Sequence, residues 1–294
     1  MAEGRIIKAL SGFYYVKTAD DQVYECRGRG VFRKRNITPL VGDFVSFDSD
    51  HHQEGYITEI KPRQNELVRP PIANIDQAII VSSASMPHFS HLLLDRFLVL
   101  IESKHIKPII FISKMDLITD DEQAIFSTIK NDYEQIGYSV ELISAKDPKS
   151  LQHLDHYFTD KISVISGQSG VGKSSILNAL NASLFIETDE ISKSLGRGKH
   201  TTRHVELVEV LGGLVADTPG FSSLEFDEIE QEELGDCFPE MRRVKDMCRF
   251  RGCMHDQEPR CAVKKAVENG QINDKRYNHY LSFLQEIKLR KPRY

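Results

Sequence analysis

A glycine-rich segment at residues 167–174 restricts the fold of this chain more than any other feature. It reads Gly-Gln-Ser-Gly-Val-Gly-Lys-Ser and fits the pattern GxxxxGK followed by Ser or Thr, in which a tight loop surrounds phosphate groups. The apolar run 162–165 precedes the loop, and the helix-forming stretch 175–180 follows it. A strand, a phosphate loop and a helix in this order predict an α/β fold, with the loop at the carboxyl edge of a parallel sheet.

The residue types in this segment suit a bound phosphate chain. Glycines let backbone N–H groups turn toward phosphate oxygens, and the N-terminus of the following helix adds unpaired N–H donors. We expect Lys173 to neutralise the β and γ phosphate oxygens, a catalytic as well as a binding role, and Ser174 to be a Mg²⁺ ligand. The predicted nucleotide-binding residues are Gly167, Gln168, Ser169, Gly170, Val171, Gly172, Lys173, Ser174 and Ser175.

Four apolar runs, including the one before the phosphate loop, predict the strands of the sheet. They cover residues 78–81, 108–112, 139–143 and 162–165. Strands that are apolar at nearly every position are buried on both faces, as in a parallel sheet flanked by helices. We assign residues 67–223 to this α/β domain, because Pro62, Pro70 and Pro71 mark a break before it.

Two short polar segments follow these strands and fit recognition of a guanine base. In Ser113-Lys-Met-Asp116, the Asp116 carboxylate can accept both N–H groups of the guanine edge, and the Lys114 stem can lie over the ring. Adenine would leave this charge unpaired. Ser144-Ala-Lys146 can donate a backbone N–H to the guanine oxygen. The predicted base-binding residues are Ser113, Lys114, Asp116, Ser144, Ala145 and Lys146.

A further segment, Asp217-Thr-Pro-Gly220, follows the apolar residues 214–216. We expect Asp217 to hold the Mg²⁺ shell and the Gly220 N–H to contact the γ-phosphate. Taken alone, each of these short segments also fits an ordinary turn. Their shared position at strand ends favours one nucleotide site, and Asp116 favours GTP over the alternative of a helicase-like or transporter-like ATPase.

Residues 1–66 contain five short strand-like runs. They cover 6–10, 12–16, 22–26, 44–47 and 55–60. This pattern predicts a small barrel, of which the oligonucleotide-binding (OB) type is a common form. The cations Arg27, Arg29, Arg33, Lys34 and Arg35 have no acid between them and lie beside Phe32. This run fits contact with an RNA backbone, and the alternative is a solvated hairpin loop.

The C-terminal residues 224–294 are predicted to be helical and to hold a metal ion. Three thiols and one imidazole lie within a short segment: Cys248, Cys253, His255 and Cys261. Four protein ligands complete a tetrahedral Zn²⁺ site without a position for a reacting water, so we expect one structural zinc ion. The alternative is a group of reduced, buried cysteines. Cys26 and Cys237 are predicted to be ordinary core residues.

Charge is distributed unevenly along the chain. The net charge is −5, yet residues 241–294 contain 14 Lys and Arg against 6 Asp and Glu. The acidic run 225–236 has apolar residues at helical spacing, which predicts a helix with a solvated acidic face. With 40% hydrophobic and 28% charged residues, the composition excludes a disordered or collagen-like chain. No apolar run approaches the roughly 20 residues that a membrane span needs, and no signal peptide is evident, so we expect a cytoplasmic protein.

The nucleotide segments resemble the guanine-nucleotide motifs of the GTPase superfamily, in an unusual order. Residues 113–116 and 144–146, which bind the base, precede the phosphate loop. This order is circularly permuted, which a parallel sheet tolerates because its loops converge on one edge. With a barrel before and a Cys/His cluster behind, essentially the whole chain resembles the bacterial ribosome small subunit-dependent GTPase A family. The resemblance implies a circularly permuted P-loop GTPase domain with an N-terminal OB-type barrel and a C-terminal helical zinc-binding domain.

The resemblance also implies an activity, cofactors and partners. These are hydrolysis of GTP to GDP and phosphate with Mg²⁺, contact with the 16S rRNA of the small ribosomal subunit, and a role in late maturation of that subunit. We expect a monomer without a membrane partner. A second interpretation is a GTP-gated rRNA-binding module, in which hydrolysis only resets the bound state. Because residues 217–220 directly precede the predicted helix 225–236, which leads into the zinc segment, we expect nucleotide state to reach the basic C-terminal surface.

Two residues depart from the common GTPase pattern. Ser113 stands where Asn is usual, and its shorter hydroxyl predicts fewer contacts and a modest guanine affinity. Phe221 stands where many GTPases have a Gln that orients water, so we expect slow intrinsic hydrolysis that needs a group from elsewhere. The segment 196–203 matches the family's first switch. There the resemblance implies Thr202, or failing it Thr201, as a Mg²⁺ ligand. His200 is a candidate for positioning water, and a solvent-exposed loop histidine is the alternative.

Overall fold

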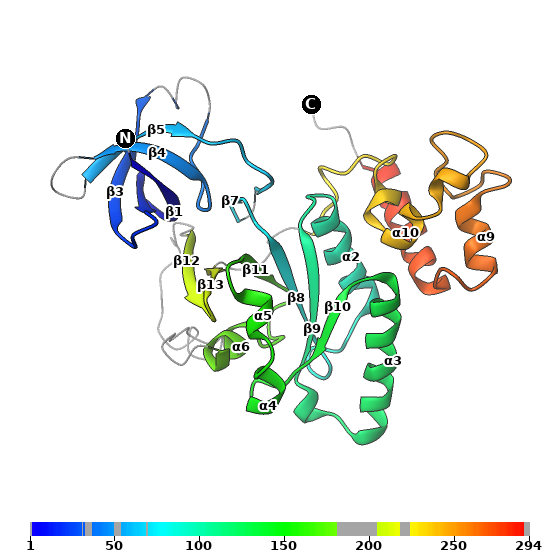
Figure 1. The fold of residues 1–294 in the computed structure, drawn as a ribbon. Helices are drawn as coiled ribbons and strands as arrows, with labels where there is room; N and C mark the ends of the chain where they lie inside the picture. Colours follow the sequence, from blue (N-terminus) through cyan, green and yellow to red (C-terminus); the bar gives the residue numbers. More distant parts are fainter. Residues whose placement is uncertain are drawn as a thin grey trace.

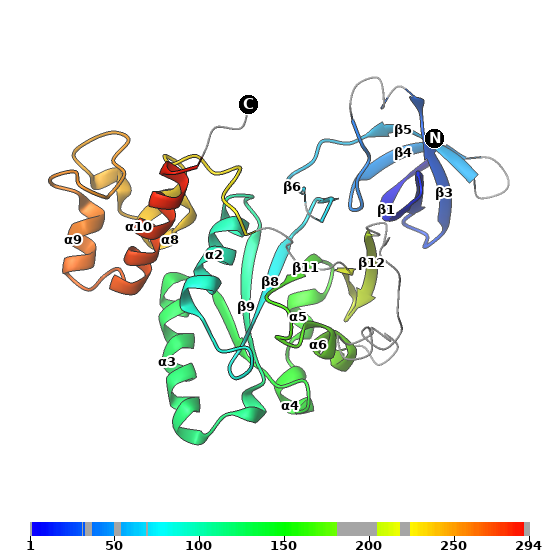
Figure 2. The same cartoon turned by 180° about the vertical axis from the view of Figure 1, so that it is seen from behind.

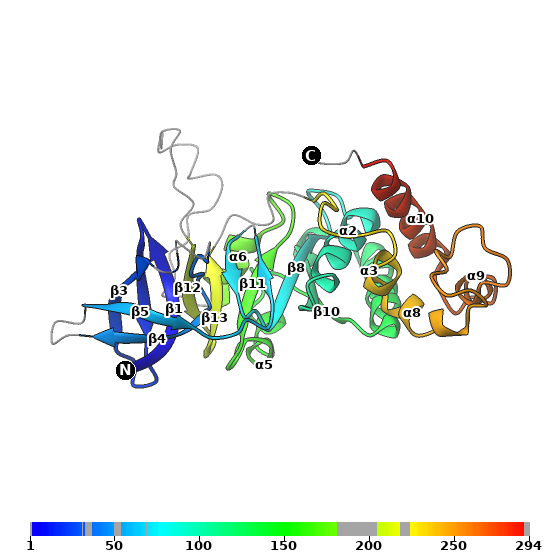
Figure 3. The ribbon, with the colours of Figure 1, turned by 90° about the horizontal axis from the view of Figure 1, so that it is seen from above.

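Three parts of the chain lie in a row in the computed structural model (Figures 1 and 3). A β-barrel lies at one end, an α/β domain in the middle and a helical part at the other end. The structure describes residues 2–30, 32, 37–49, 54–68, 70–180, 205–217 and 224–290, and the findings below refer to these residues.

The barrel consists of β1 (Ala2–Leu10), β2 (Phe13–Lys17), β3 (Val23–Gly28), β4 (Phe44–Ser49) and β5 (Glu54–Ile60). The strands pair in the order β1-β2-β3-β5-β4, and β4 pairs with β1 to close the barrel. Alternate side chains such as Ile6, Val16 and Phe47 fill the interior. Gly4 permits a close strand contact, because a Cβ there would lie 2.6 Å from the Lys17 carbonyl oxygen. The predicted five-stranded barrel is confirmed.

A short connection ties the barrel to the α/β domain. β6 (Glu66–Leu67) and β7 (Ile72–Ala73) form a two-stranded hairpin within it. Arg63 donates from Nε and from Nη2 to the carboxylate of the fully buried Asp43, each at 2.8 Å. A bidentate, charge-assisted pair of this kind fixes orientation as well as distance.

The α/β domain is built on β8 (Gln77–Ser83), β9 (Lys107–Ser113), β10 (Ser139–Leu142), β11 (Ile162–Ser166), β12 (Val205–Val210) and β13 (Gly213–Asp217). Strands β10-β9-β8-β11-β13 are parallel in that order, and β12 is antiparallel to β13. β12 also pairs with β1 of the barrel, opposing Lys8 to Glu206. The two parts therefore share one continuous sheet, a contact that the sequence did not predict.

Helices cover both faces of this sheet, as the apolar strands predicted (Figure 2). They are α2 (His91–Glu102), α3 (Asp120–Ile136), α4 (Pro148–Leu151), α5 (Asp155–Phe158) and α6 (Lys173–Leu180), with a 3-10 turn η1 (Met115–Leu117). Ile80 belongs to the same core cluster as Phe97 of α2 and Phe126 of α3. Its neighbour Ile79 belongs to a second cluster with Leu177 of α6. Successive strand residues thus serve opposite faces.

The C-terminal part has its own core around α8 (Pro239–Arg242), α9 (Ala262–Glu268) and α10 (Asp274–Lys288), with 3-10 turns η2 (Leu234–Cys237) and η3 (Lys245–Met247). Cys237 is buried here and Cys26 in the barrel, so both are core residues as predicted. None of the helices in the described ranges has the length and apolar character that crossing a membrane would require.

The helix predicted over residues 225–236 is wrong, because only η2 forms there. Phe226 and Ile229 are buried, as their spacing indicated, but the backbone before η2 is irregular. Arg290 Nη1 donates to the carbonyl oxygens of Phe226, Asp227 and Ile229 at 2.7, 2.9 and 3.2 Å. Since a distant side chain satisfies these acceptors, the segment buries its apolar residues without helical hydrogen bonds.

Candidate nucleotide site and metal centre

The predicted nucleotide segments meet at one edge of the sheet. β9 ends at Ser113, β10 leads into Ser144 and β11 leads into Gly167. These three strands and the intervening β8 are parallel neighbours, so their carboxyl ends face the same side. Segments that are far apart in sequence thus form a single site.

The phosphate loop has a backbone that glycine permits. Gly167, Gly170 and Gly172 have φ values of 143°, 79° and 95°. A Cβ on Gly167 would lie 2.2 Å from the Val81 carbonyl oxygen, so this position admits no side chain. Lys173 begins α6, and its Nζ donates to the carbonyl oxygens of Gly167 and Gln168 at 2.8 and 2.9 Å. Its charge is therefore held over the loop where a phosphate chain would bind.

Ser113 links the base segment to the phosphate loop. Its hydroxyl donates to the Val171 carbonyl oxygen at 2.6 Å, and the Ser82 carbonyl oxygen lies 3.2 Å from the same hydroxyl oxygen. Ser113 is 2% exposed, so water competes little for the bond to Val171. Lys114 Nζ makes a second link, donating to the Gly170 carbonyl oxygen at 2.7 Å. The short hydroxyl thus joins the two loops, and the modest guanine affinity expected from it stays a prediction.

Asp116 is oriented by the second base segment. Ser144 Oγ donates to Asp116 Oδ1 at 2.7 Å and accepts from the Lys146 backbone N–H at 3.1 Å. Lys146 Nζ lies 3.6 Å from the other carboxylate oxygen. The hydrogen bond from Ser144 is the main cause that lowers the pKa of Asp116 below its usual value. Asp116 is therefore ionised at neutral pH, the state in which it can accept two N–H donors from guanine.

Several predicted residues lie outside the described part of the site. Gly220, His200 and Thr202 are among them, and so are Thr201 and Phe221. For Asp217 the structure describes the backbone, which ends β13 beside β11. The Mg²⁺ and water-positioning roles stay predictions.

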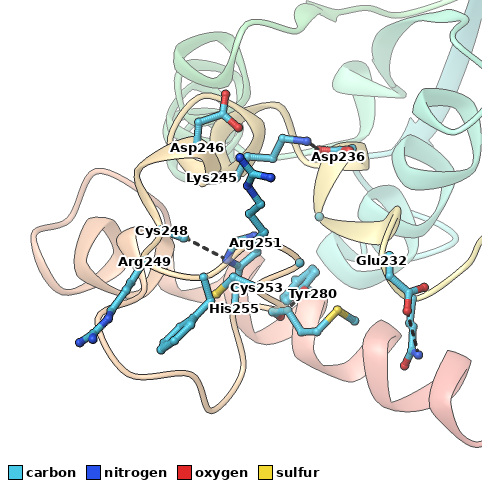
Figure 4. A pocket seen from close by; sticks show the side chains of 15 residues that line it. Glu232, Asp236, Lys245, Asp246, Cys248, Arg249, Arg251, Cys253, His255 and Tyr280 are labelled. Carbon is cyan, nitrogen blue, oxygen red and sulfur yellow. Dashed lines mark hydrogen bonds and ion pairs between the residues drawn. The ribbon is translucent and has the colours of Figure 1, made fainter.

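The four predicted zinc ligands converge in the C-terminal part. Figure 4 labels three of them, Cys248, Cys253 and His255. The ligand atoms of Cys248, Cys253, His255 and Cys261 all lie within 4.8 Å of one another. His255 Nδ1 is 3.6 Å from Cys248 Sγ and 3.3 Å from Cys261 Sγ, and the two sulfur atoms are 3.9 Å apart. A tetrahedral site with Zn–S bonds of about 2.3 Å has ligand edges of ~3.8 Å, so the cluster fits zinc.

Surrounding groups suit metal-bound thiolates. The backbone N–H of Ala262 donates to Cys248 Sγ at 3.3 Å, and that of Lys264 donates to Cys261 Sγ at 3.5 Å. Such donors stabilise negative sulfur. Burial lowers the pKa of His255, which favours the neutral imidazole that binds a metal. Tyr277 Oη donates to the His255 carbonyl oxygen at 2.7 Å and fixes this part of the loop to α10.

A buried ion network joins the C-terminal part to the α/β domain, and the sequence did not predict it. Arg276 of α10 pairs with Asp95 of α2 and, at 2.5 Å, with Glu240 of α8. Tyr133 of α3 donates to Asp95 Oδ1 at 2.9 Å, and His279 Nδ1 lies 2.6 Å from Asp95 Oδ2. A charged residue within the apolar run 92–101 was the available signal for a buried partner.

The basic run of the barrel is described in part. Arg29 pairs with Asp48 at 2.7 Å, and Arg27 lies over the Phe13 ring, 4.6 Å from its centroid. Phe32 is 9% exposed and packs in the core, so its ring is not available on the surface beside these cations. The remaining cations of the run, Arg33, Lys34 and Arg35, lie outside the described residues.

Base-reading loops that precede the phosphate loop in the chain, yet share its sheet edge, define a circularly permuted GTPase. Known proteins agree with this class. The sequence model described as RsgA GTPase matches residues 60–227, and that of the RsgA N-terminal domain matches residues 3–57. The chain belongs to the RsgA GTPase family, and the fold class expected from the sequence is confirmed.

Individual relatives match over their whole length. A protein of Oceanobacillus iheyensis named small ribosomal subunit biogenesis GTPase RsgA 2 is 66% identical over 294 residues, with 100% of both chains covered. One of Bacillus subtilis, named small ribosomal subunit biogenesis GTPase RsgA, is 59% identical over 298 residues, again with 100% of both covered. The crystal structure of YloQ, a circularly permuted GTPase, superposes with a TM-score of 0.87 at 55% identity, covering 100% of this chain and 97% of that one. YjeQ from Thermotoga maritima also gives 0.87, at 35% identity and 99% coverage of each chain.

Proposed function

We propose that this protein is a GTPase of small ribosomal subunit biogenesis, which hydrolyses GTP to GDP and phosphate slowly by itself and faster when bound to the small subunit. Relatives that are 66% and 59% identical over the whole chain carry this function in their names. The observation that carries the nucleotide part is the hydrogen bond from Ser113 Oγ to the Val171 carbonyl oxygen. It joins the base-reading loop to the phosphate loop, as one bound guanine nucleotide requires.

The described residues have separable roles in this proposal. Asp116, held by Ser144, selects guanine by accepting two N–H groups, and Lys114 covers the ring while its Nζ is tied to the phosphate loop. The loop N–H groups and Lys173 bind the β and γ phosphates. Lys173 stabilises the charge that develops on these oxygens as the terminal phosphoryl group leaves, which is its catalytic contribution.

Mg²⁺ and water complete the proposed reaction. Ser174, Thr202 and Asp217 are the proposed Mg²⁺ ligands, and the ion neutralises charge on the phosphate oxygens. His200 is the proposed residue that positions the attacking water. Since Phe221 cannot orient water, the small subunit supplies or orders a group that helps to do so. Without the subunit that help is lost, which accounts for the proposed slow intrinsic rate.

The zinc site has a structural role in this proposal. Cys248, Cys253, His255 and Cys261 supply four ligands and leave no position for a reacting water. When bound, the ion links loops that have few apolar residues of their own and so keeps the C-terminal surface in shape. We assign the functional parts to residues 1–66, 67–223 and 224–294.

We further propose that the C-terminal part contacts 16S rRNA. Several cations here are paired internally, namely Arg242, Lys245, Arg276, Lys288 and Arg290. In contrast, Arg249, Arg251 and Arg260 on the zinc-ligand loops form no ion pair within the described residues, and Arg249 points away from the zinc ligands (Figure 4). Arg249 and Arg251 border a pocket of about 510 Å³ beside the metal site. Arginines without a carboxylate partner suit a phosphate backbone. In this proposal the protein acts as a monomer in the cytoplasm.

The test is GTP turnover by the purified protein with and without small ribosomal subunits. We expect stimulation by the subunit, competition by GDP but not by ATP, and loss of the stimulation after zinc is removed by a chelator. A Lys173→Ala variant serves as the inactive control. Equal turnover with and without subunits would contradict the proposed function.

The alternative is a GTP-gated rRNA-binding module whose hydrolysis only resets the bound state. Its support is that residues 226–229 follow the predicted γ-phosphate segment 217–220 closely in sequence. Arg290, just after α10, donates to the carbonyl oxygens of Phe226 and Ile229. A variant that binds GTP but cannot hydrolyse it separates the two functions. If the alternative holds, this variant should still support subunit maturation. If hydrolysis is the activity, the variant should not support maturation. Equal subunit affinity with GDP and with a GTP analogue would rule out gating.

A further inference from the structure

Ser150 lies outside the nucleotide motifs, yet its hydroxyl is bonded into the loop that reads the base. Ser150 Oγ accepts a hydrogen bond from the Ser144 backbone N–H at 3.0 Å. Its own hydrogen donates to the Asp147 carbonyl oxygen at 2.8 Å, and the Ser144 carbonyl oxygen lies 3.0 Å from the same hydroxyl oxygen. One side chain thus holds both ends of the turn 144–147.

The Ser144 N–H depends on Ser150 more than the two carbonyl groups do. The Ser144 carbonyl oxygen also accepts from the Asp147 N–H at 3.1 Å, and the Asp147 carbonyl oxygen also accepts from the Ser150 N–H at 3.1 Å. Within the described residues the Ser144 N–H has no second acceptor, and Ser144 is 3% exposed. Without the Ser150 hydroxyl this donor would be buried and unpaired, which is costly.

The core and the start of α4 fix the position of Ser150. Its neighbour Leu151 is buried in the same cluster as Ile143, the residue before Ser144. The carboxylate of Asp147 accepts from the Lys149 N–H at 3.0 Å and so caps α4. The Ser150 hydroxyl therefore has a fixed place, and the turn bonded to it is pre-organised for a ligand.

The turn leaves one backbone N–H available for a ligand. The Ser144 N–H is used by Ser150, and the Lys146 N–H donates to Ser144 Oγ at 3.1 Å. The Ala145 N–H has no hydrogen-bond partner among the residues that the structure describes. It lies next to Ser144, whose Oγ is bonded to Asp116. A base that is bound by Asp116 would therefore have the Ala145 N–H within its surroundings.

We propose that Ser150 is a positioning residue for guanine recognition, which holds the turn 144–147 so that the Ala145 N–H donates to the oxygen at position 6 of the base. This inference rests on the proposed function, because the ligand must be a guanine nucleotide. Asp116 accepts the N–H at position 1 and the amino group at position 2 of the same base edge. Each part of the edge then has its own support, with Ser144 Oγ behind Asp116 and Ser150 behind the turn.

Nucleotides altered at one position of the base separate these two contacts. 6-Thio-GDP has sulfur, a weak acceptor, in place of the oxygen and keeps both N–H groups that Asp116 would bind. IDP keeps the oxygen and lacks the amino group at position 2. The affinities of the full-length protein for GDP, 6-thio-GDP and IDP are measured by displacement of a fluorescent GDP. Diphosphates are used because they are not hydrolysed during the measurement.

Ser150→Ala should weaken the binding of GDP and of IDP by about 5- to 10-fold each, because both lose the contact to the oxygen. Binding of 6-thio-GDP should fall by about twofold or less, since its sulfur accepts only a weak hydrogen bond. The preference for GDP over 6-thio-GDP should therefore narrow, whereas the preference for GDP over IDP should stay. Ser150→Thr, which keeps the hydroxyl, should retain both preferences.

Ser103→Ala is the matched control. The Ser103 hydroxyl donates to the Leu100 carbonyl oxygen at 3.0 Å, at the end of α2 and before β9 begins. It should leave all three affinities unchanged. Unchanged GDP affinity in Ser150→Ala, or an equal loss for all three nucleotides, would overturn the proposal. A narrowed preference for GDP over IDP would also overturn it, because Asp116 rather than the turn would then depend on Ser150.

The positioning role and the proposed function can fail separately. Subunit-stimulated GTP turnover of the unaltered protein is measured in parallel. If stimulation is present and Ser150→Ala leaves the preference for GDP over 6-thio-GDP unchanged, the positioning role alone is wrong. If this preference narrows as expected but small subunits do not stimulate turnover, the proposed function is wrong and the base contact stands.

Discussion

Ser113 Oγ lies 2.6 Å from the carbonyl oxygen of Val171, so the loop that reads the base is hydrogen-bonded to the loop that holds the phosphates. The two residues are 58 positions apart in sequence. This bond fixes the spacing between the two halves of the nucleotide site before any nucleotide binds. Pre-organisation of this kind lowers the entropy lost on binding.

Loss of the Ser113 hydroxyl should weaken both GTP and GDP binding. In Ser113→Ala the buried Val171 carbonyl loses its partner, and we expect a decrease in affinity of about 5- to 10-fold for each nucleotide. Ser113→Thr should retain most of the affinity. Ser127→Ala on the exposed side of α3 is the control, since its hydroxyl bonds only within its own helix. Calorimetric titration measures the affinities, and an effect on GTP alone would contradict a role in spacing.

Asp116→Asn should change which base is bound. Guanine offers two N–H donors to a carboxylate, whereas an amide presents one acceptor and one donor. We expect GTP affinity to fall by about 100-fold and xanthosine triphosphate, which has a carbonyl in place of the 2-amino group, to bind better than GTP. Competition between the two nucleotides measures this exchange. Retained preference for GTP would place the base elsewhere.

Ser144→Ala should change the pH dependence of GDP binding. The hydrogen bond from Ser144 lowers the pKa of Asp116, so the carboxylate stays ionised as the pH falls from neutral. Its contribution to folding and binding is present above the ordinary Asp pKa and is lost as the pH falls through the lowered folded-state value. Without Ser144 the pKa rises, and affinity should be lost at a higher pH. GDP titrations across the pH range with a constant circular dichroism spectrum test this, and coincident profiles would refute it.

Cys253→Ala should remove the bound zinc and unfold the loops around it. Three remaining ligands leave an open position, so the metal is held less tightly. Cys237→Ala is the matched control, because Cys237 is a buried thiol of the same part and burial raises its pKa to about 12, away from the thiolate state. Elemental analysis should find zinc in the control and little in Cys253→Ala. Limited proteolysis should cut the Cys253→Ala variant after residue 240. Equal zinc content in the two variants would contradict the proposed zinc site.

Arg276→Ala should lower the free energy of unfolding more than a substitution that breaks an exposed ion pair, and should weaken the attachment of the C-terminal part. It leaves Asp95 and Glu240 buried without their cation, and we expect the free energy of unfolding to fall by about 3–5 kcal/mol. Arg242→Ala, which breaks the more exposed pair with Glu102, should cost about 0–1 kcal/mol. Urea denaturation at equal zinc content compares the variants. The triple variant with Asp95→Asn, Glu240→Gln and Arg276→Met should recover most of the loss.

Local pattern was sufficient for the parts of this protein in which neighbouring residues carry the signal. The phosphate loop is recognisable because Gly167 and Lys173 stand at the spacing that the phosphate-loop pattern requires, within one short segment. The strand before it is recognisable because both its faces are apolar. The four zinc ligands lie within one short segment, and the structure brings their ligand atoms to within 4.8 Å of one another.

Other features depend on partners that are distant in sequence. The predicted helix over 225–236 fails because Arg290 supplies hydrogen bonds that local periodicity does not reveal. The pairing of β12 with β1, at Lys8 and Glu206, joins strands almost 200 residues apart. Nothing in either strand alone marks it as the partner of the other, because backbone hydrogen bonds carry no sequence information.

The residue order by itself determined the chemistry available to this protein: a phosphate loop, a carboxylate for guanine and a four-ligand metal site. The tertiary structure decided how these groups act together. It set Ser113 against Val171, docked the C-terminal part through Arg276, and paired β12 with β1 of the barrel. The physical reason is range, since helix and loop signals act over a few residues, whereas burial and strand register depend on the whole packed chain.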